Sequence, residues 1–453
     1  MARFAFVTVG VQSHANQYSE VARRLLGRGH QVIFFTHDPV AVKQLQAGGF
    51  ECIRLDGARQ GPRRSVLHHR LSKARAEVRT ASQAVYEDEE MLGLLEEHRP
   101  DVVLIDYELK DHVIRIVPTG RTVILIEYHC SANRTGRVPI LSSRLMPVGS
   151  RLDRLRFAAT WWATELGRRA AFSLARLCYG RYEYMSTLKR LAKRHGFDFR
   201  RDTSLRGWHY LSFPNQPTLY FSAPEFDFPN DFPNRSWFVG PRVEIGRLDA
   251  LADDDADRVR RWLEEGRDNE DRPLIFCALG SLLSKPAFCK AVLAAAEKRR
   301  DWRVLLTLGR RLDTDSLGAI PENALVVNYA PQLDVLAHAD LMLTHGGASS
   351  IAECVIQGVP MVVYSGEVMD QNGNAARVAY HRLGLRRDIR HATAARIEQA
   401  IEAALADVEL HDAVARMRKV FSAHLDSPRL FELLEAAAGE GGELPRWHGS
   451  ADC

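Results

Sequence analysis

Short apolar runs alternate with helically spaced stretches along both halves of this 453-residue chain. They lie at 4–9, 31–36, 101–106 and 123–127 in the first half, and at 274–278, 303–308, 325–328, 341–343 and 361–364 in the second. Apolar runs of this length between helices are typical of parallel strands that are buried on both faces of a sheet. The pattern therefore predicts an α/β chain with two doubly wound halves.

The second half carries a glycine-rich turn directly after one of these strands. His345 is followed by Gly346 and Gly347, and a helix is predicted from Ser350 to Gly358. Glycines let backbone N–H groups approach an anion, and a helix N-terminus adds partial positive charge, so the turn predicts a phosphate site. Two simpler alternatives are a tight turn at the glycines and a capping box from Ser350 to Glu353.

The combination of motifs around this turn is more specific than any one of them. THGG is followed by Glu353 inside the helix, GVP at its end, Asp370-Gln371 after the next strand, and then NAAR. This order resembles the donor-binding signature of family 1 (UDP-glycosyltransferase-type) inverting glycosyltransferases, especially bacterial natural-product enzymes of the zeaxanthin and macrolide type. The resemblance implies the GT-B fold, in which two Rossmann-like domains face each other across a cleft.

The resemblance also implies a nucleotide-sugar donor site. The ring of Tyr329 would stack on the base, the backbone of Ala330 would pair with the base edge, and Gln332 would reach the ribose. The resemblance implies UDP as the nucleotide. The family usually has Trp where this chain has Tyr329, so TDP, which would use the same contacts, is the alternative. The expected donor-binding residues are Gly280, Ser281, Tyr329, Ala330, Gln332, His345, Gly346, Gly347, Ser349, Ser350, Glu353, Asp370 and Gln371.

The first half offers a base and a supporting acid. His14 lies in a polar loop predicted before a helix from Tyr18 to Leu26, and Asp106 ends a later strand. Both positions belong to the carboxyl edge of the sheet, where such folds bind ligands. The resemblance implies that His14 is the general base, and Asp106 would orient its imidazole. Asp111 is a rival for that role, and the simpler alternatives are a solvated loop histidine and an aspartate that caps a helix.

Composition argues against several other classes of protein. The net charge of +4 does not indicate a nucleic-acid-binding surface. Seven scattered cysteines without a CxxC pair predict a reducing, cytoplasmic location. The N-terminus is predicted to be a strand rather than a signal peptide, and no apolar run reaches the roughly 18 residues that span a bilayer. The sequence gives no indication of the oligomeric state.

Two aspartate clusters, at 253–255 and 313–315, raise the question of a metal site. Neither cluster follows an apolar strand, as a metal site for a nucleotide would, so both are predicted to be solvated loops. We therefore expect no metal and no cofactor beyond the nucleotide sugar, which is a co-substrate.

The motifs divide the chain into two domains. Residues 1–240 are predicted to bind the acceptor and to include a helical insertion at about 151–205. Residues 241–272 are predicted to be a linker, 273–438 the donor-binding domain and 439–453 a flexible tail.

The predicted insertion is basic and amphipathic. One apolar helical face is formed by Leu152, Leu155, Ala159, Trp162, Leu166 and Ala170. Arginines and lysines outnumber acids in the same span. The helix is predicted either to pack on the core, or to wall a greasy acceptor cleft and rest on an anionic membrane surface.

These expectations converge on one activity. The protein would move a hexose, most simply glucose from UDP-glucose, to a hydroxyl of a lipophilic small molecule. Polar contacts from Asp370 and Gln371 would reject deoxy sugars. The reaction would take place in the cytoplasm. A further expectation is that the protein makes peripheral contact with the inner face of the membrane. The alternatives are a nucleotide-sugar epimerase or hydrolase on the same fold and a non-catalytic nucleotide-sugar-binding protein.

Overall fold

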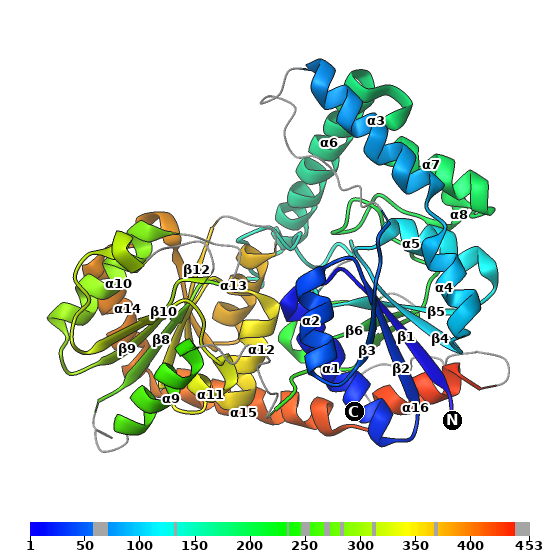
Figure 1. The fold of residues 1–453 in the computed structure, drawn as a ribbon. Coiled ribbons are helices and arrows are strands. Elements are labelled where there is room, and N and C mark those ends of the chain that lie inside the picture. The colour runs from blue at the N-terminus through cyan, green and yellow to red at the C-terminus, as the bar shows by residue number, and fades with distance from the viewer. Residues whose placement is uncertain are drawn as a thin grey trace.

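The computed structural model describes residues 1–57, 71–130, 134–232, 235–245, 254–266, 272–280, 285–309, 314–366 and 370–439. Within these ranges the chain forms two parallel sheets, each covered by helices (Figure 1). This two-sheet architecture is the α/β GT-B fold that the sequence predicts.

The first sheet is formed by β1 (Arg3–Thr8), β2 (Gln31–Thr36), β3 (Glu51–Arg54), β4 (Val102–Asp106), β5 (Thr122–Glu127), β6 (Thr218–Tyr220) and β7 (Ser236–Phe238). In the described chain its order is β3-β2-β1-β4-β5-β6-β7, and all neighbouring strands are parallel. The order reverses between β1 and β4, so the loops after these two strands meet at the carboxyl edge of the sheet.

The second sheet is formed by β8 (Leu274–Ala278), β9 (Arg303–Thr307), β10 (Ala324–Val327), β11 (Leu341–Thr344), β12 (Met361–Ser365) and β13 (Gly384–Asp388). In the described ranges its order is β10-β9-β8-β11-β12-β13, again all parallel. β8 and β11 are neighbours, so Gly280 and the His345 turn leave the sheet side by side.

Helices cover both faces of each sheet. Their bounds are α1 (Gln12–Gly27), α2 (Pro39–Ala47), α3 (Leu71–Glu87), α4 (Glu90–His98), α5 (Lys110–Ile116), α6 (Asp153–Tyr179), α7 (Tyr184–His195), α8 (Phe199–Asp202), α9 (Asp254–Glu265), α10 (Pro286–Lys298), α11 (Gln332–Leu336), α12 (Ala348–Gln357), α13 (Gln371–Tyr380), α14 (Ala394–Ala406), α15 (Val408–Asp426) and α16 (Arg429–Ala437). The sequence predicts that the first helix begins at Tyr18, whereas α1 begins at Gln12. His14 therefore lies in the first turn of a helix and not in a loop.

Two helices do not follow the domain limits that the sequence predicts. Leu430, Phe431 and Leu434 of α16 pack into the core of the first sheet, although the predicted second domain runs to residue 438. Val259 and Leu263 of α9, inside the predicted linker, pack into the core of the second sheet. Helical spacing shows which face of a helix is apolar, but it does not show which core that face joins. Of the predicted tail, 440–453 lies outside the described residues.

The long helix α6 stands above the first sheet together with α3 and α7 (Figure 1). It buries Phe157 and Trp161, whereas Leu155, Trp162 and Leu166 are 69%, 62% and 69% exposed. The prediction that the latter face packs on the core is therefore wrong. The buried face of α6 is a different one, formed at four-residue spacing by Asp153, Phe157, Trp161 and Glu165. Among the described residues, no helix is long and apolar enough to cross a bilayer.

Candidate active site

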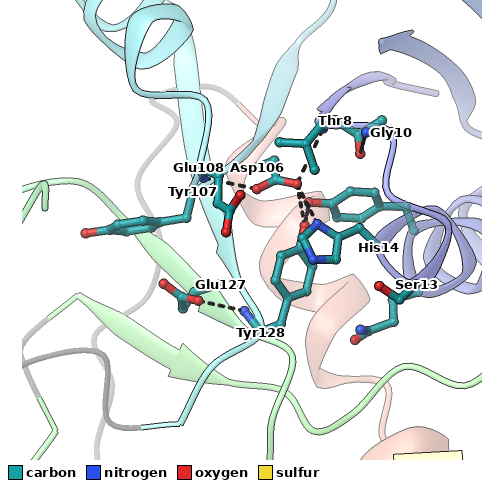
Figure 2. Close-up of polar contacts among 12 residues, drawn as sticks. Thr8, Gly10, Ser13, His14, Asp106, Tyr107, Glu108, Glu127 and Tyr128 are labelled. Carbon is teal, nitrogen blue, oxygen red and sulfur yellow. Dashed lines mark hydrogen bonds and ion pairs between the residues drawn. The ribbon is translucent and has the colours of Figure 1, made fainter. Parts of the chain in front are cut away.

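His14 and Asp106 meet at the carboxyl edge of the first sheet. His14 Nδ1 lies 3.0 Å from Asp106 Oδ2, and the Asp106 side chain is fully buried (Figure 2). With Nδ1 donating to the carboxylate, the lone pair of the neutral imidazole is on Nε2. His14 remains 16% exposed, so it forms the solvent-facing member of the pair.

Two tyrosines that sequence reasoning did not assign to the site complete its inner side. Tyr128 Oη donates to Asp106 Oδ2 at 2.7 Å, and its ring lies against the His14 ring with centroids 3.7 Å apart (Figure 2). Tyr18, one helical turn after His14, hydrogen-bonds the Tyr128 hydroxyl in turn. The signal for Tyr128 was its position directly after a predicted strand end, the same signal that identified Asp106.

The surroundings of Asp106 keep it ionised. Burial acts to raise the pKa of Asp106, yet His14 and the hydrogen bonds from Tyr128 and the backbone of Glu108 hold it below the usual value. Asp111 points elsewhere and pairs with Arg115 at 2.9 Å. The structure thus brings Asp106, and not Asp111, to the imidazole.

The glycine turn of the second sheet encloses His345. A Cβ on Gly280 would lie 2.7 Å from His345 Cε1, and one on Gly347 would lie 2.9 Å from His345 Nε2, so both positions need glycine. Gly346 adopts φ +91°, a conformation that favours glycine. Burial lowers the pKa of His345, although Asp370 and the backbone of Ala278 act in the opposite direction. Its Nδ1 is buried without a hydrogen-bond partner among the described residues, which suits an added polar ligand.

Gln332, the predicted ribose contact, begins α11 and lies beside two residues of α12. Gln332 Nε2 donates to Glu353 Oε2 at 2.6 Å and to Ser350 Oγ at 3.3 Å. The N-cap of α12 is Gly347, without a side-chain cap, so the alternative of a Ser350–Glu353 capping box is wrong.

Tyr329 and Ala330 lie between β10 and α11. The Asp255 carboxylate accepts from the backbone N–H groups of Asn328, at 2.8 Å, and Tyr329, at 3.3 Å. This acid of the first aspartate cluster therefore fixes the backbone beside the predicted base-stacking residue. Asp253 and Asp313 of the two clusters, and the predicted donor residue Ser281, lie outside the described residues.

Asp370 and Gln371 begin α13 beside the glycine turn. Asn374 connects these elements, because its side-chain amide donates to the Gly346 carbonyl at 2.9 Å and to Asp370 Oδ2 at 2.7 Å. Gln371 is buried, with its backbone carbonyl close to Gly346. The turn and the Asp370-Gln371 pair thus form one connected unit.

The two halves of the candidate site touch. Gln17 Nε2, one turn after His14 on α1, donates to Ser349 Oγ at 3.0 Å, and Ser349 lies in the first turn of α12. The same hydroxyl lies 3.5 Å from the Ser13 carbonyl. The helix that carries His14 and the helix that follows the glycine turn therefore begin next to each other.

Comparison with known proteins agrees with this architecture. The family described as "UDP-glucoronosyl and UDP-glucosyl transferase" matches residues 227–430. These residues belong to that family. The match runs from the segment before β7 to the first turn of α16 and includes every predicted donor-site residue, whereas His14 and Asp106 lie outside it.

Curated relatives are similar mainly over part of their length. The chain is 31% identical to the NDP-glycosyltransferase YjiC of Bacillus subtilis (strain 168) over 46% of this chain and 50% of that protein. It is 30% identical to demethyllactenocin mycarosyltransferase of Streptomyces fradiae over 45% and 41%. With these relatives the chain thus spans about half of their length or less. A longer similarity, at 24% identity over 93% and 96%, is to 4'-demethylrebeccamycin synthase of Lentzea aerocolonigenes.

Solved structures agree over nearly the whole chain. The glycotransferase of kitacinnamycin superimposes with a TM-score of 0.67 at 22% identity, over 98% of this chain and 99% of that one. The glycosyltransferase VinC, solved in complex with DTDP, gives 0.62 at 18% identity, over 96% and 99%. At these identities the likeness establishes the fold.

Proposed function

We propose that this protein is an inverting glycosyltransferase that moves a hexose from a nucleotide sugar to a hydroxyl of a lipophilic small molecule. The observation that carries the proposal is the contact between Gln17 and Ser349, which brings the His14–Asp106 pair beside the glycine turn. A base and an anion-binding turn side by side suit a reaction in which a proton is removed while a diphosphate leaves.

The first sheet supplies the acceptor side of this reaction. Nε2 of His14 takes the proton from the acceptor hydroxyl while that oxygen attacks the anomeric carbon from the face opposite the diphosphate. Asp106 holds the imidazole in the required tautomer and stabilises the imidazolium that forms, with Tyr128 fixing the carboxylate.

The second sheet supplies the donor side. The bond between the anomeric carbon and the diphosphate oxygen breaks, and the nucleoside diphosphate leaves with the electron pair. His345, the backbone of Gly346 and Gly347, Ser350 and the start of α12 would meet this charge. Gln332 and Glu353 would hold the ribose, and Asp370 and Gln371 the sugar hydroxyls.

We propose UDP-glucose as the donor. Polar groups as deeply set as Gln371 favour a fully hydroxylated sugar, because an unpaired buried polar group costs about 1–3 kcal/mol. The curated relatives' names include a mycarosyltransferase, and one related structure binds DTDP, so a dTDP-sugar is the competing donor.

The direct test is a mass-spectrometric screen with purified protein. UDP-glucose is offered with a panel of lipophilic hydroxylated acceptors, and dTDP-sugars are offered in parallel. A product one hexose heavier, together with UDP release that depends on acceptor, is the expected result. UDP release without acceptor indicates a hydrolase, conversion of the sugar indicates an epimerase, and binding without turnover indicates a non-catalytic protein. Equal or faster transfer from a dTDP-deoxysugar would contradict the proposed donor.

We also propose that α6 holds the protein against an anionic membrane from which a lipophilic acceptor is taken. Its exposed apolar stripe includes Leu155, Trp162 and Leu166. Its two acids, Asp153 and Glu165, are buried and paired with arginines, so the exposed charges of the helix are positive. Exposed apolar residues flanked by cations fit the surface of an anionic bilayer.

The membrane proposal is tested by sedimentation with liposomes. Wild-type protein should sediment at low salt with phosphatidylglycerol vesicles, less so at high salt, and little with neutral phosphatidylcholine. Trp162→Glu combined with Leu166→Glu should abolish sedimentation. Val408→Glu, at a 72% exposed valine of α15, is the matched control and should not. Equal sedimentation of both variants would contradict a role for α6.

A further inference from the structure

A second ionisable cluster lies at the carboxyl end of β5, separate from the His14 pair. Glu127 is fully buried and accepts from the backbone N–H group of Tyr128 at 3.0 Å (Figure 2). It also accepts from the backbone N–H group of His129 at 3.0 Å. His129 Nδ1 lies 2.5 Å from Glu127 Oε1, and His209 Nε2 hydrogen-bonds Oε2. One buried carboxylate thus holds two histidines.

His129 carries the positive charge of this cluster. Burial opposes a charged ring, but Glu127 outweighs it and raises the pKa of His129 to about 9. Burial lowers the pKa of His209, which stays neutral. Burial acts to raise the pKa of Glu127, yet the two histidines hold it well below its usual value. The other charged groups that face His129 are Glu108, Asp370 and, beyond Glu127, the buried Lys110.

The charged ring of His129 faces the other domain. Its Nε2 lies 3.9 Å from Asp370 Oδ2, at the start of α13. This separation is too long for a direct hydrogen bond, but one oxygen atom about 2.8 Å from each atom fits between them. Such an oxygen would accept from the imidazolium and donate to the carboxylate, which is what a hydroxyl group can do.

We propose that His129 and Asp370 form a clamp for one hydroxyl group of the transferred sugar, with one side contributed by each domain. His129 is then a specificity-determining residue, and His209 is a positioning residue that acts through Glu127. This inference rests on the proposed glycosyl transfer and extends its sugar site into the acceptor domain. A sugar without that hydroxyl would leave two nearly buried charged groups unbridged.

Two histidines and a carboxylate are also common zinc ligands. Here one ring nitrogen of each histidine, Nδ1 of His129 and Nε2 of His209, is hydrogen-bonded to a Glu127 oxygen, and Oε1 also accepts two backbone N–H groups. Hydrogen bonds thus occupy the nitrogen and oxygen atoms that would bind a metal ion, so we assign the cluster to hydroxyl recognition rather than to a metal.

The test compares UDP-glucose with its 2-, 3-, 4- and 6-deoxy analogues as donors. Wild-type enzyme should discriminate against one analogue by about 5- to 150-fold in kcat/KM. His129→Ala should lose most of that one preference while the affinity for UDP, measured by calorimetry, stays unchanged. His129→Gln, which keeps an N–H donor, should retain part of it. His112→Gln is the matched control, since His112 is another buried histidine of the same domain that pairs with His37 instead.

The pH profile separates the clamp from a purely structural role. His129 stays charged at neutral pH and loses its charge as the pH rises through about 9, so the donor KM of wild type should rise there. In folded His129→Gln this rise should disappear, and His209→Gln should change the pH at which it occurs, because His209 no longer hydrogen-bonds Glu127. Unchanged discrimination and pH profile in the His129 variants, or one zinc per purified chain, would overturn the inference. Absence of transfer from any donor by wild type would instead refute the proposed function.

Discussion

The His14 pair and the His345 turn occupy equivalent edges of two similar sheets. They differ in how many of their polar side-chain atoms are hydrogen-bonded within the protein. Asp106 receives hydrogen bonds from His14, Tyr128 and a backbone N–H group of its own domain. His345 is enclosed by glycines and leaves a buried nitrogen without a partner in the described chain. The first region is built to hold one protonation state, whereas the second is built to admit a ligand.

The largest expected effect is the loss of the base. His14→Ala should lower turnover by roughly two to four orders of magnitude, because it removes general-base catalysis. UDP binding, measured by calorimetry, should barely change, since the binding groups lie in the other region. His391→Ala, at an exposed histidine of the second domain, is the control. Turnover within a few-fold of wild type would mean that His14 is not the base.

The supporting acid should matter less than the base. Asp106→Asn should reduce turnover by less than His14→Ala does, because the imidazole remains available with a weaker partner. Asp111→Asn should have a smaller effect still, since Asp111 pairs with Arg115. Measured kcat values for the three variants check this order, and a greater loss at Asp111 would reassign the role.

Asp106→Asn should also change the stability of the protein at acid pH. The folded-state pKa of Asp106 lies below its usual value, so its contribution is present above about pH 4 and is lost as the pH falls through the folded pKa. Urea denaturation between about pH 3 and about pH 7 measures the free energy of unfolding. Asp106→Asn should lose less of this free energy on acidification than wild type does. An identical pH dependence in both proteins would contradict an ionised, stabilising Asp106.

In the donor region, a single added methyl group should lower both the stability of the protein and its affinity for UDP. Gly346→Ala places a Cβ 2.8 Å from Val363 Cγ1 at φ +91°, so it should destabilise the protein by about 1–3 kcal/mol and weaken UDP binding. Gly167→Ala on α6 meets nothing within 4 Å and should stabilise it by up to about 1 kcal/mol. Urea denaturation of both variants measures the difference, and similar values would contradict a constrained turn.

The smallest expected effect is that of a chelator. Treatment with EDTA should leave transfer activity unchanged, since His345, the glycine turn and α12 are proposed to meet the diphosphate charge. Activity restored specifically by a divalent cation after EDTA would transfer that role to a metal. The aspartates at 253–255 and 313–315 would then be the first residues to substitute.

Much of the fold and part of the site follow from the sequence alone. Buried parallel strands require continuous apolar runs, and the turns that follow them collect glycines and polar groups, so the two-sheet fold and candidates such as His14, Asp106 and His345 are recognisable locally. The sequence also narrowed the candidates for the acid that supports His14 to Asp106 and Asp111. It placed His14 in a loop, because the first turn of a helix often contains polar residues that resemble a loop.

Only the tertiary structure decided which of these groups meet. Asp106 rather than Asp111 reaches His14, Tyr128 and His129 join ionisable networks, and α16 crosses to the first sheet. The outward face of α6 is likewise a tertiary result, since the helix buries Phe157 and Trp161 and leaves its longer apolar stripe exposed. Local sequence sets backbone geometry and apolar periodicity, whereas a contact between distant residues, such as that between His14 and Asp106, depends on how the strands of the sheet are ordered and how the helices pack on them.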